Sequence, residues 1–325
     1  MNTLHFVCGI FISLGIAFVL PDPGSPGGFL APSYTGAIST FLIFLIQGIQ
    51  LKKGALRELV KFWPLHVGCQ CANFIFAPVV FFILAKLSKP FIQDNSIFMG
   101  MLFLGMLPTT INSAIAMVQM AAGHAPSAIL NSSVSNVLGV FIMPIWINFW
   151  MDRLGELTLR LAPVFLKLFL LILLPVFVGR IIGQKLKIID WAEKGKQMKL
   201  ISMYLIFLIV YFSFCRSVKS NVWSSIDLPS LAFLTLFVLL GLFTVHLGTW
   251  YAGKFLKFSE SQLPVFLFCG SQKTLAAGIP LATAMLSQKE LPIDPGLFLI
   301  PIMIYHPLQM IVGGRWIYIL NQRSL

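Results

Sequence analysis

The chain contains ten apolar runs, each close to the length that crosses a lipid bilayer as a helix. A transmembrane helix needs about 20 predominantly apolar residues, and short clusters of Pro, Gly, Ser or charged residues separate these runs. Only 10% of the 325 residues are charged and 58% are hydrophobic, whereas soluble domains carry about 25% charged residues. The sequence predicts an all-α polytopic membrane protein that forms a single transmembrane unit in the lipid bilayer.

The expected spans follow directly from these runs. They cover residues 4–20, 35–51, 64–85, 96–122, 126–150, 161–182, 200–215, 229–252, 262–287 and 296–320. An even number of spans places both termini on the same side of the membrane. Most Lys and Arg residues lie in the connections on that side, such as residues 52–61 and 180–199, and basic connections stay in the cytoplasm. We therefore expect both termini to be cytoplasmic and the protein to lie in the plasma membrane.

The chain divides near residue 155 into two halves with five expected spans each. An odd number of spans gives the halves opposite orientations, as in transporters built from inverted repeats. The fourth span of each half is interrupted by Pro, Gly or small polar residues, at 108–110 and at 270–272. Corresponding interruptions in two halves point to a transport site. We expect residues 1–155 and 156–325 to form two inverted five-helix repeats with discontinuous spans 4 and 9.

The charged residues exclude several other classes of protein. The formal net charge is +12, but the basic residues lie in short clusters between apolar runs, which is not the exposed basic face of a nucleic-acid-binding protein. All 11 Asp and Glu residues lie in connections or at span ends, so an intramembrane aspartyl protease or a carboxylate proton relay would lack its acids. Nucleotide-binding and hydrolase motifs are missing from the expected contexts. We expect neither an enzyme nor a resident cofactor, and the sequence does not indicate an oligomeric state.

Polar residues inside the expected spans concentrate in three runs. These are LPTTINSAIAMVQ in span 4, AILNSSVSNVLG in span 5 and FLFCGSQKTLAAGIP in span 9. A break in a span is tolerated only where protein or a water-filled cavity surrounds it, and the polar residues of span 5 share one helical face. One interpretation is that they only join helices through hydrogen bonds; the other is a binding site. The candidate binding residues are Thr109, Thr110, Asn112, Ser113, Asn131, Ser132, Ser135, Asn136, Ser271, Gln272, Lys273 and Thr274.

Lys273 is the most unusual of these residues, because it lies roughly 11 residues into span 9. At about 1.5 Å per residue it is roughly 16 Å deep, where a cation costs at least about 2.5 kcal/mol. Without a carboxylate in the spans it must meet carbonyl or amide oxygens, meet a bound anion, or lose its proton. His306 is a further candidate, because Pro307 frees a backbone carbonyl one turn earlier.

These runs together resemble the bile acid:sodium symporter family, and more closely its divergent bile-acid-symporter-like branch. The resemblance rests on FLIQGIQLKKGALRE after span 2, PLHVGCQCANFIFAP in span 3, LPTTINSA followed by GHAPSAILNSSVSNVLG, and FCGSQKTLAAGIP. It implies a panel domain of spans 1, 2, 6 and 7 and a core domain of spans 3–5 and 8–10, in which spans 4 and 9 unwind and cross. It also implies secondary transport of an organic anion, such as a bile acid or a small carboxylate or sulfate, by alternating access.

The resemblance also implies positions for sodium ligands. They correspond to Asn112, Ser113, Asn131 or Ser132 in spans 4 and 5, to Gln70 or Asn73 in span 3, and to Ser271 and Gln272 in span 9. Sodium-coupled members carry a glutamate in span 9 where this chain reads Phe268-Cys269-Gly270. The ammonium of Lys273 would repel a sodium ion 4 Å away by roughly 4 kcal/mol. We expect an organic-anion transporter whose sodium coupling is disfavoured; the alternative is a regulatory or scaffold protein that keeps the fold without transporting.

Overall fold

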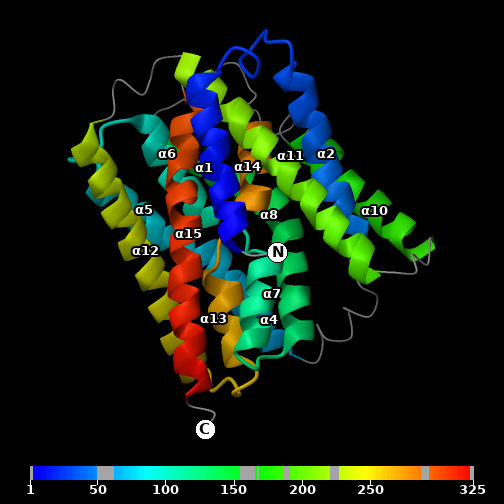
Figure 1. Cartoon of the computed structure of the whole chain (residues 1–325). Helices are drawn as coiled ribbons and strands as arrows, with labels where there is room; N and C mark the ends of the chain where they lie inside the picture. Colours follow the sequence, from blue (N-terminus) through cyan, green and yellow to red (C-terminus); the bar gives the residue numbers. More distant parts are fainter. Residues whose placement is uncertain are drawn as a thin grey trace. The chain divides into compact units, whose positions relative to one another are not determined.

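The computed structural model describes residues 3–49, 62–153, 165–166, 168–185, 191–219, 227–286 and 293–322, which contain helices and no strand (Figure 1). The helices are α1 (Thr3–Val19), α2 (Pro32–Ile49), α4 (Trp63–Cys71), α5 (Ala77–Ser88), α6 (Asn95–Met106), α7 (Asn112–Met120), α8 (Ala125–Arg153), α10 (Leu174–Lys185), α11 (Trp191–Lys219), α12 (Leu228–Phe255), α13 (Leu263–Ser271), α14 (Leu275–Met285) and α15 (Pro295–Asn321). Two π-helical turns, η1 (Ala72–Phe76) and η2 (Phe169–Leu173), precede α5 and α10.

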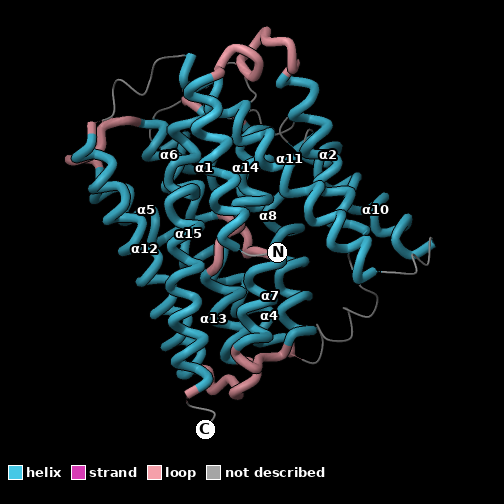
Figure 2. Tube along the Cα trace, in the orientation of Figure 1, coloured by secondary structure: helices cyan, strands magenta, loops and turns pink. Residues whose placement is uncertain are grey.

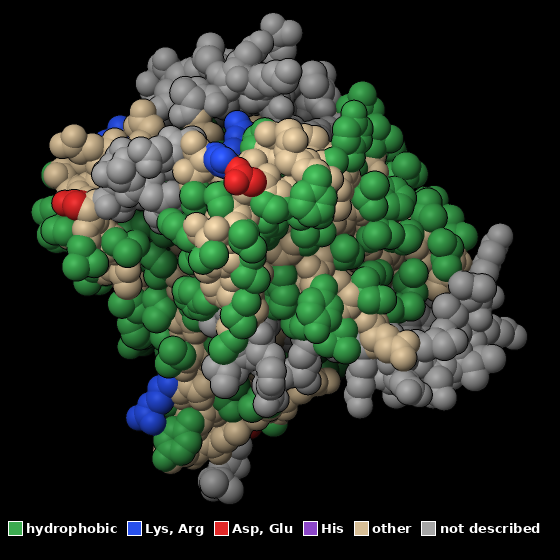
Figure 3. All heavy atoms as spheres, turned by 45° about the horizontal axis from the view of Figure 1, so that its top comes forward, with side chains coloured by type: hydrophobic (Ala, Val, Ile, Leu, Met, Phe, Trp, Pro, Cys, Tyr) green, Lys and Arg blue, Asp and Glu red, His purple; other side chains and the backbone are tan. Residues whose placement is uncertain are grey.

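Within the described residues, five helical segments are long and apolar enough to cross a membrane. They are Pro32–Ile49, Trp63–Ser88, Ala125–Trp150, Leu228–Phe255 and Pro295–Asn321. Large apolar side chains on these segments are exposed, including Leu240, Phe243 and Leu247 of α12, and hydrophobic side chains cover wide areas of the face shown in Figure 3. An apolar surface of this extent needs lipid as its solvent. The chain is therefore an all-helical integral membrane protein.

Where the structure describes them, the helix bounds follow the apolar runs closely, with one clear difference. The expected start of the sixth span, at residue 161, lies outside the described residues. α12 and α15 begin and end within a few residues of the expected spans 229–252 and 296–320. In contrast, α11 begins at Trp191, well before the expected start at residue 200. The additional turns, AEKGKQMK, are mostly strong helix formers but polar. Apolar residues in a sequence mark only the apolar part of a helix, and the whole helix can be longer.

The chain folds into two compact units, each assembled from separate parts of the sequence. Unit 1 contains Met1–Lys52, Asn148–Ile226 and Ile279–Leu297, and unit 2 contains Lys53–Ile147, Asp227–Gly278 and Phe298–Leu325. In unit 1, α2 packs against α10 and α11, and α11 packs against α1. In unit 2, α5 packs against α6 and α12, and α13 packs against α4, α7 and α12.

Glycine allows the closest of these packings, between α2 and α10. Gly48 of α2 lies against the backbone carbonyl of Val176, and Gly179 of α10 lies against that of Leu45. A Cβ atom at either glycine would overlap the carbonyl oxygen of the other helix. The two backbones therefore approach as small residues permit at helix interfaces in membranes.

Two helix pairs associated with unit 2 are separated by short non-helical segments, drawn as pink loops in Figure 2. Segment 107–111 separates α6 from α7, and segment 272–274 separates α13 from α14. The first segment includes the expected interruption at 108–110. The second begins later than expected, because α13 continues through Gly270 to Ser271, whose hydroxyl donates to the carbonyl of Leu267 at 2.6 Å. Gln272 then turns the chain out of the helix with an extended backbone, ψ 141°.

Candidate functional site

The side chain of Lys273 is fully buried in unit 2, and oxygen atoms surround its nitrogen. Nζ lies 2.9 Å from the carbonyl oxygen of Gly105, 2.9 Å from that of Leu107, 3.1 Å from that of Asn73 and 3.5 Å from Oδ1 of Asn73. An ammonium group has three N–H donors, and the three carbonyls can accept one each. Over the part of the chain that the structure describes, no carboxylate forms an ion pair with Lys273. We call these four oxygens the ammonium cage.

Two of the cage carbonyls are available because α6 ends where it does. In a continuous α-helix the carbonyl of Gly105 would accept the N–H of Thr109, but this N–H donates instead to Oγ of Ser135 at 3.2 Å. Leu107 precedes Pro108, and a residue before proline avoids the helical conformation. Its ψ of 140° turns its carbonyl away from the helix and toward Lys273.

The third carbonyl, that of Asn73, is available because of the π-helical turn η1. The N–H of Ala77 pairs with the carbonyl of Ala72, five residues back, and so leaves the carbonyl of Asn73 without its usual partner. The next residue that could donate is Pro78, which has no N–H. π-helical turns occur often at functional sites. Here the turn directs one carbonyl at the ammonium of Lys273.

Side chains of α15 replace the backbone hydrogen bonds that segment 272–274 lacks. The N–H of Lys273 donates to Oε1 of Gln309 at 2.8 Å, and Nε2 of Gln309 donates back to the carbonyl of Lys273 at 2.9 Å. The hydroxyl of Tyr305 donates to the carbonyl of Ser271 at 2.8 Å. His306 lies beside Gln309, with Nδ1 2.8 Å from Nε2 of that residue. The structure thus places His306 next to the group that fixes Lys273, and not in the ammonium cage.

The polar face of α8 mainly supports segment 107–111. The hydroxyl of Ser132 donates to the carbonyl of Thr110 at 3.0 Å, and Nδ2 of Asn136 donates to the carbonyl of Thr109 at 3.1 Å. Ser135 accepts the N–H of Thr109, as described above. Asn131 differs from these three, because its Oδ1 accepts from Nε2 of Gln70 at 3.2 Å.

The two non-helical segments contact each other directly. The N–H of Thr274 donates to the carbonyl of Pro108 at 3.0 Å. The hydroxyl groups of Thr110 and Ser113 both lie near Oε1 of Gln272, at 3.4 and 3.3 Å. The structure therefore brings most of the sequence-predicted polar residues together in unit 2. The side chain of Asn112 lies outside the part of the chain that the structure describes.

Some buried polar atoms in this region have no hydrogen-bond partner in the part of the chain that the structure describes. Oγ1 of Thr109 and Oε1 of Gln70 are buried without a hydrogen-bond partner among the described residues. Buried polar atoms are usually paired, so each exception needs a reason such as an ion or a bound water. Within the described ranges no group of three or more His, Cys, Asp or Glu side chains could hold a metal ion.

The sequence did not indicate several groups that shape the site. These are the carbonyls of Gly105 and Leu107 and the side chains of Tyr305 and Gln309. Backbone carbonyls have no signature of their own, because their availability depends on where a helix ends. A signal for Gln309 was present, since a lone amide in an expected span needs a partner inside the protein.

Unit 1 contains a separate cavity of about 200 Å³. Apolar residues that include Leu171, Ile209 and Phe212 line it together with the cationic side chain of Arg216. No described ion pair involves Arg216. The sequence did not single out this cavity, because its residues come from four distant stretches of the chain.

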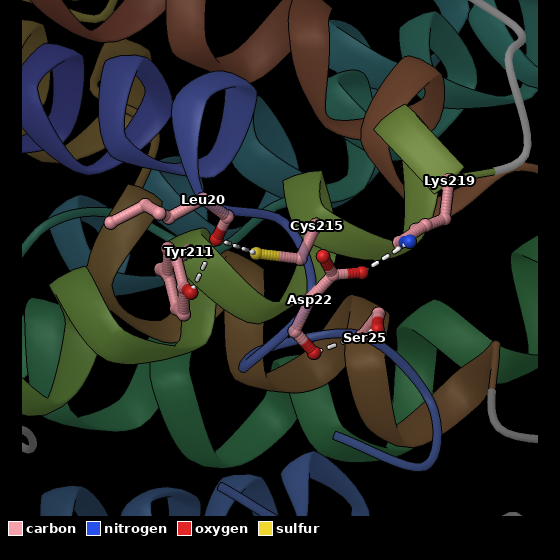
Figure 4. A network of polar contacts seen from close by, with 6 residues as sticks. All are labelled: Leu20, Asp22, Ser25, Tyr211, Cys215 and Lys219. Carbon is pink, nitrogen blue, oxygen red and sulfur yellow. Dashed lines mark hydrogen bonds and ion pairs between the residues drawn. The ribbon is translucent and has the colours of Figure 1, made fainter. Parts of the chain in front are cut away.

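A polar network beside the cavity fastens the loop after α1 to α11 (Figure 4). Asp22 forms an ion pair with Lys219, and the hydroxyl of Tyr211 donates to the carbonyl of Leu20 at 2.7 Å. Within the loop, the hydroxyl of Ser25 donates to the carbonyl of Asp22 at 2.9 Å. The same loop contributes residues to the cavity wall.

Comparison with known proteins identifies the family. The profile of the SBF-like CPA transporter family matches residues 5–320. The chain is 30% identical over 300 residues to the protein YfeH of Escherichia coli, covering 91% of this chain and 86% of that protein. It is 25% identical over 315 residues to sodium/bile acid cotransporter 7 of Rattus norvegicus, covering 95% and 90%. These matches confirm the resemblance seen in the sequence, and the chain belongs to the SBF-like CPA transporter family.

Proposed function

We propose that the protein is a secondary active transporter that moves a small organic anion across the membrane by alternating access. The observation that carries the proposal is the meeting of segments 107–111 and 272–274 around a buried ammonium group. Non-helical backbone at membrane depth is tolerated where it surrounds a binding cavity, and transporters use it to bind ions and substrates. In this proposal α6 with α7, and α13 with α14, are the discontinuous spans 4 and 9 of two inverted repeats.

The two compact units support a division into a panel and a core. Unit 1 contains α1, α2, α10 and α11, which correspond to the expected panel spans 1, 2, 6 and 7. Unit 2 contains most of the helices of the expected core spans 3–5 and 8–10. Transport would then consist of a movement of the core against the panel.

We propose further that transport does not require sodium. Relatives include proteins named as sodium/bile acid cotransporters, but here a buried ammonium already supplies one positive charge near Gln272. The side chains of Thr110, Ser113 and Gln272 contact one another through hydroxyl and amide groups. All three are uncharged, so they provide no negative charge to balance a sodium ion. Repulsion of roughly 4 kcal/mol at 4 Å would oppose a sodium ion beside Lys273.

The cavity in unit 1 supports the assignment of an anionic, partly apolar substrate. A guanidinium group binds carboxylate or sulfate through paired hydrogen bonds, and Arg216 lines the cavity without an ion-pair partner in the described chain. Leu171, Ile209 and Phe212 would contact the apolar part of the same molecule. Sites for small molecules commonly combine an apolar wall with a few polar groups.

A flux measurement in liposomes tests the proposal. Purified protein would be reconstituted and offered labelled steroid conjugates, small carboxylates and small sulfates under a sodium gradient, a proton gradient or no gradient. We expect uptake of at least one anion class that is the same with sodium and with a non-transported cation. Uptake that needs sodium would contradict sodium independence. The absence of flux and of ligand-induced stabilisation for every compound would favour the scaffold alternative.

A further inference from the structure

We propose that the ammonium cage is a monovalent-cation site whose cation is attached to the chain. Three backbone carbonyls and one amide oxygen converge on Nζ of Lys273 from α6, its C-terminal end and η1. Carbonyl oxygens arranged in this way replace the hydration shell of a cation, as in the filters of potassium channels. The cage is built for a cation and contains, in place of a free ion, the end of a lysine side chain.

The chemistry of the cage determines which cations it can accept. All four ligands are neutral oxygens, and the described residues provide no carboxylate beside them. Neutral oxygens cannot compensate the desolvation of a divalent ion, because burial of charge becomes costly without an opposite charge. The contacts of 2.9 to 3.1 Å to the carbonyls are those of N–H donors. The class of ligand is therefore a primary ammonium ion or a weakly hydrated monovalent metal ion.

The geometry also explains why the cage cannot remain empty without a cost to stability. The carbonyls of Gly105, Leu107 and Asn73 are held in place by Pro108, Ser135 and the turn η1, which do not depend on Lys273. Shortening the lysine would leave these acceptors in position without a donor. The cage should then accept a free cation of suitable size.

Lys273→Ala provides the direct test, because alanine retains Cβ and the missing atoms correspond to propylammonium. Melting temperatures of the purified protein would be measured in propylammonium, ammonium, potassium and sodium chloride, with choline chloride at equal ionic strength as the reference. We expect the variant to melt lower than wild type and to recover in a saturable manner with propylammonium or ammonium. Wild type should show no such dependence.

Lys254→Ala is the matched control, because Lys254 lies in the same unit on an exposed part of α12, with Nζ 4.7 Å from the ring centre of Trp250. None of the cations should raise the melting temperature of Lys254→Ala above its value in choline chloride. Equal stabilisation of the control and of Lys273→Ala would contradict a specific cage. The same conclusion would follow if no cation stabilised Lys273→Ala.

Lys273→Met keeps the proposal testable if the alanine variant does not fold. Methionine fills the space of the lysine stem but brings no charge and no donor. We expect it to melt below wild type and to be stabilised by ammonium or potassium, which are small enough to enter beside it. A Lys273→Met protein that melts at the wild-type temperature without cation dependence would overturn the proposal.

The inference deepens the proposed function and rests on it only for the consequence that a tethered cation replaces a coupling ion. The cage proposal and the proposed transport function can fail separately. Loss of flux for all anions would remove the transport function and leave the melting results unaffected. Absence of cation recovery in both variants would remove the cage proposal, even if wild type carried anions without sodium.

Discussion

Segments 107–111 and 272–274 both interrupt helices, but they do so by different means and contribute opposite groups. In the first segment Pro108 ends α6, and the freed carbonyls of Gly105 and Leu107 accept hydrogen bonds. The second segment contains neither proline nor glycine, and it contributes the ammonium of Lys273. Two breaks that contact each other can therefore be chemically complementary instead of equivalent.

The two segments also depend on different helices for support. α8 supports the first through Ser132, Ser135 and Asn136. α15 supports the second through Tyr305 and Gln309. Each segment replaces the hydrogen bonds of its missing helical turn with side chains, because unpaired backbone groups are costly inside a membrane protein.

Reversing the charge of Lys273 should have the largest effect on this arrangement. In Lys273→Glu a buried carboxylate would face the carbonyls of Asn73, Gly105 and Leu107, all of which repel it. We expect a loss of more than about 3 kcal/mol in the free energy of unfolding, measured by reversible unfolding in SDS. Lys254→Glu, on an exposed part of α12, should change the value little. A stable Lys273→Glu protein would show that the cage does not require a cation.

Removing the support of the second segment should have the next largest effect. Gln309→Leu would leave the N–H and the carbonyl of Lys273 buried without partners. Each of the two unsatisfied groups costs at least about 1 kcal/mol, so we expect a loss of at least about 2 kcal/mol in the same assay. Gln119→Leu, at an exposed position of α7, is the control. Equal values for the two variants would mean that the segment keeps its shape without α15.

Lys273 and Arg216 should differ in function, because only Arg216 lines a cavity that could hold an anion. The ammonium group of Lys273 donates to backbone carbonyls. Arg216 lines a cavity instead, and it forms no ion pair with a described residue. Arg216→Gln should raise the KM for anion uptake about tenfold, equivalent to about 1.4 kcal/mol, and leave the melting temperature unchanged. Lys219→Gln, which only breaks the exposed pair with Asp22, should leave the KM unchanged. An unaltered KM in Arg216→Gln would exclude this cavity as the anion site.

Removing the support of the first segment should cost less stability than Gln309→Leu. Ser135→Ala would leave the buried N–H of Thr109 without its acceptor, at a cost of about 1 to 2 kcal/mol. Ser133, a neighbour on α8, donates only to the carbonyl of Ile129 in its own helix, so Ser133→Ala should cost less than about 0.5 kcal/mol. If both variants lost the same stability, the polar face of α8 would have no special relation to segment 107–111.

Parts of this arrangement follow from the sequence, and the physical reasons are clear. Apolar runs locate helices such as α12 and α15, because lipid-facing and core residues are both apolar. Pro108 marks the end of α6, since proline and the residue before it oppose the helical conformation. The spacing of Ser132, Ser135 and Asn136 places them on one face of α8, which contacts the first segment.

Other parts depend on tertiary structure and could not be anticipated. The direction of the Lys273 side chain is set by carbonyls from η1 and α6, which are distant in sequence. The carbonyl of Ser271, at the end of α13, accepts a hydrogen bond from the hydroxyl of Tyr305, which is distant in sequence. The sequence indicates that Gln309 needs a partner inside the protein, but that this partner is the backbone of Lys273 becomes visible only in the folded structure.

Solid-state NMR of the lysine nitrogen can show whether Lys273 is a charged ammonium group surrounded by backbone carbonyls. The protein would carry ¹⁵Nζ-lysine and ¹³C-carbonyl glycine, and dipolar recoupling would be measured for wild type and for Lys273→Met. The structure places Nζ of Lys273 2.9 Å from the carbonyl oxygen of Gly105. We predict an ammonium resonance that is dephased by glycine carbonyl carbon and is missing from Lys273→Met. A neutral-amine resonance for Lys273, or an ammonium signal without dephasing, would contradict the account.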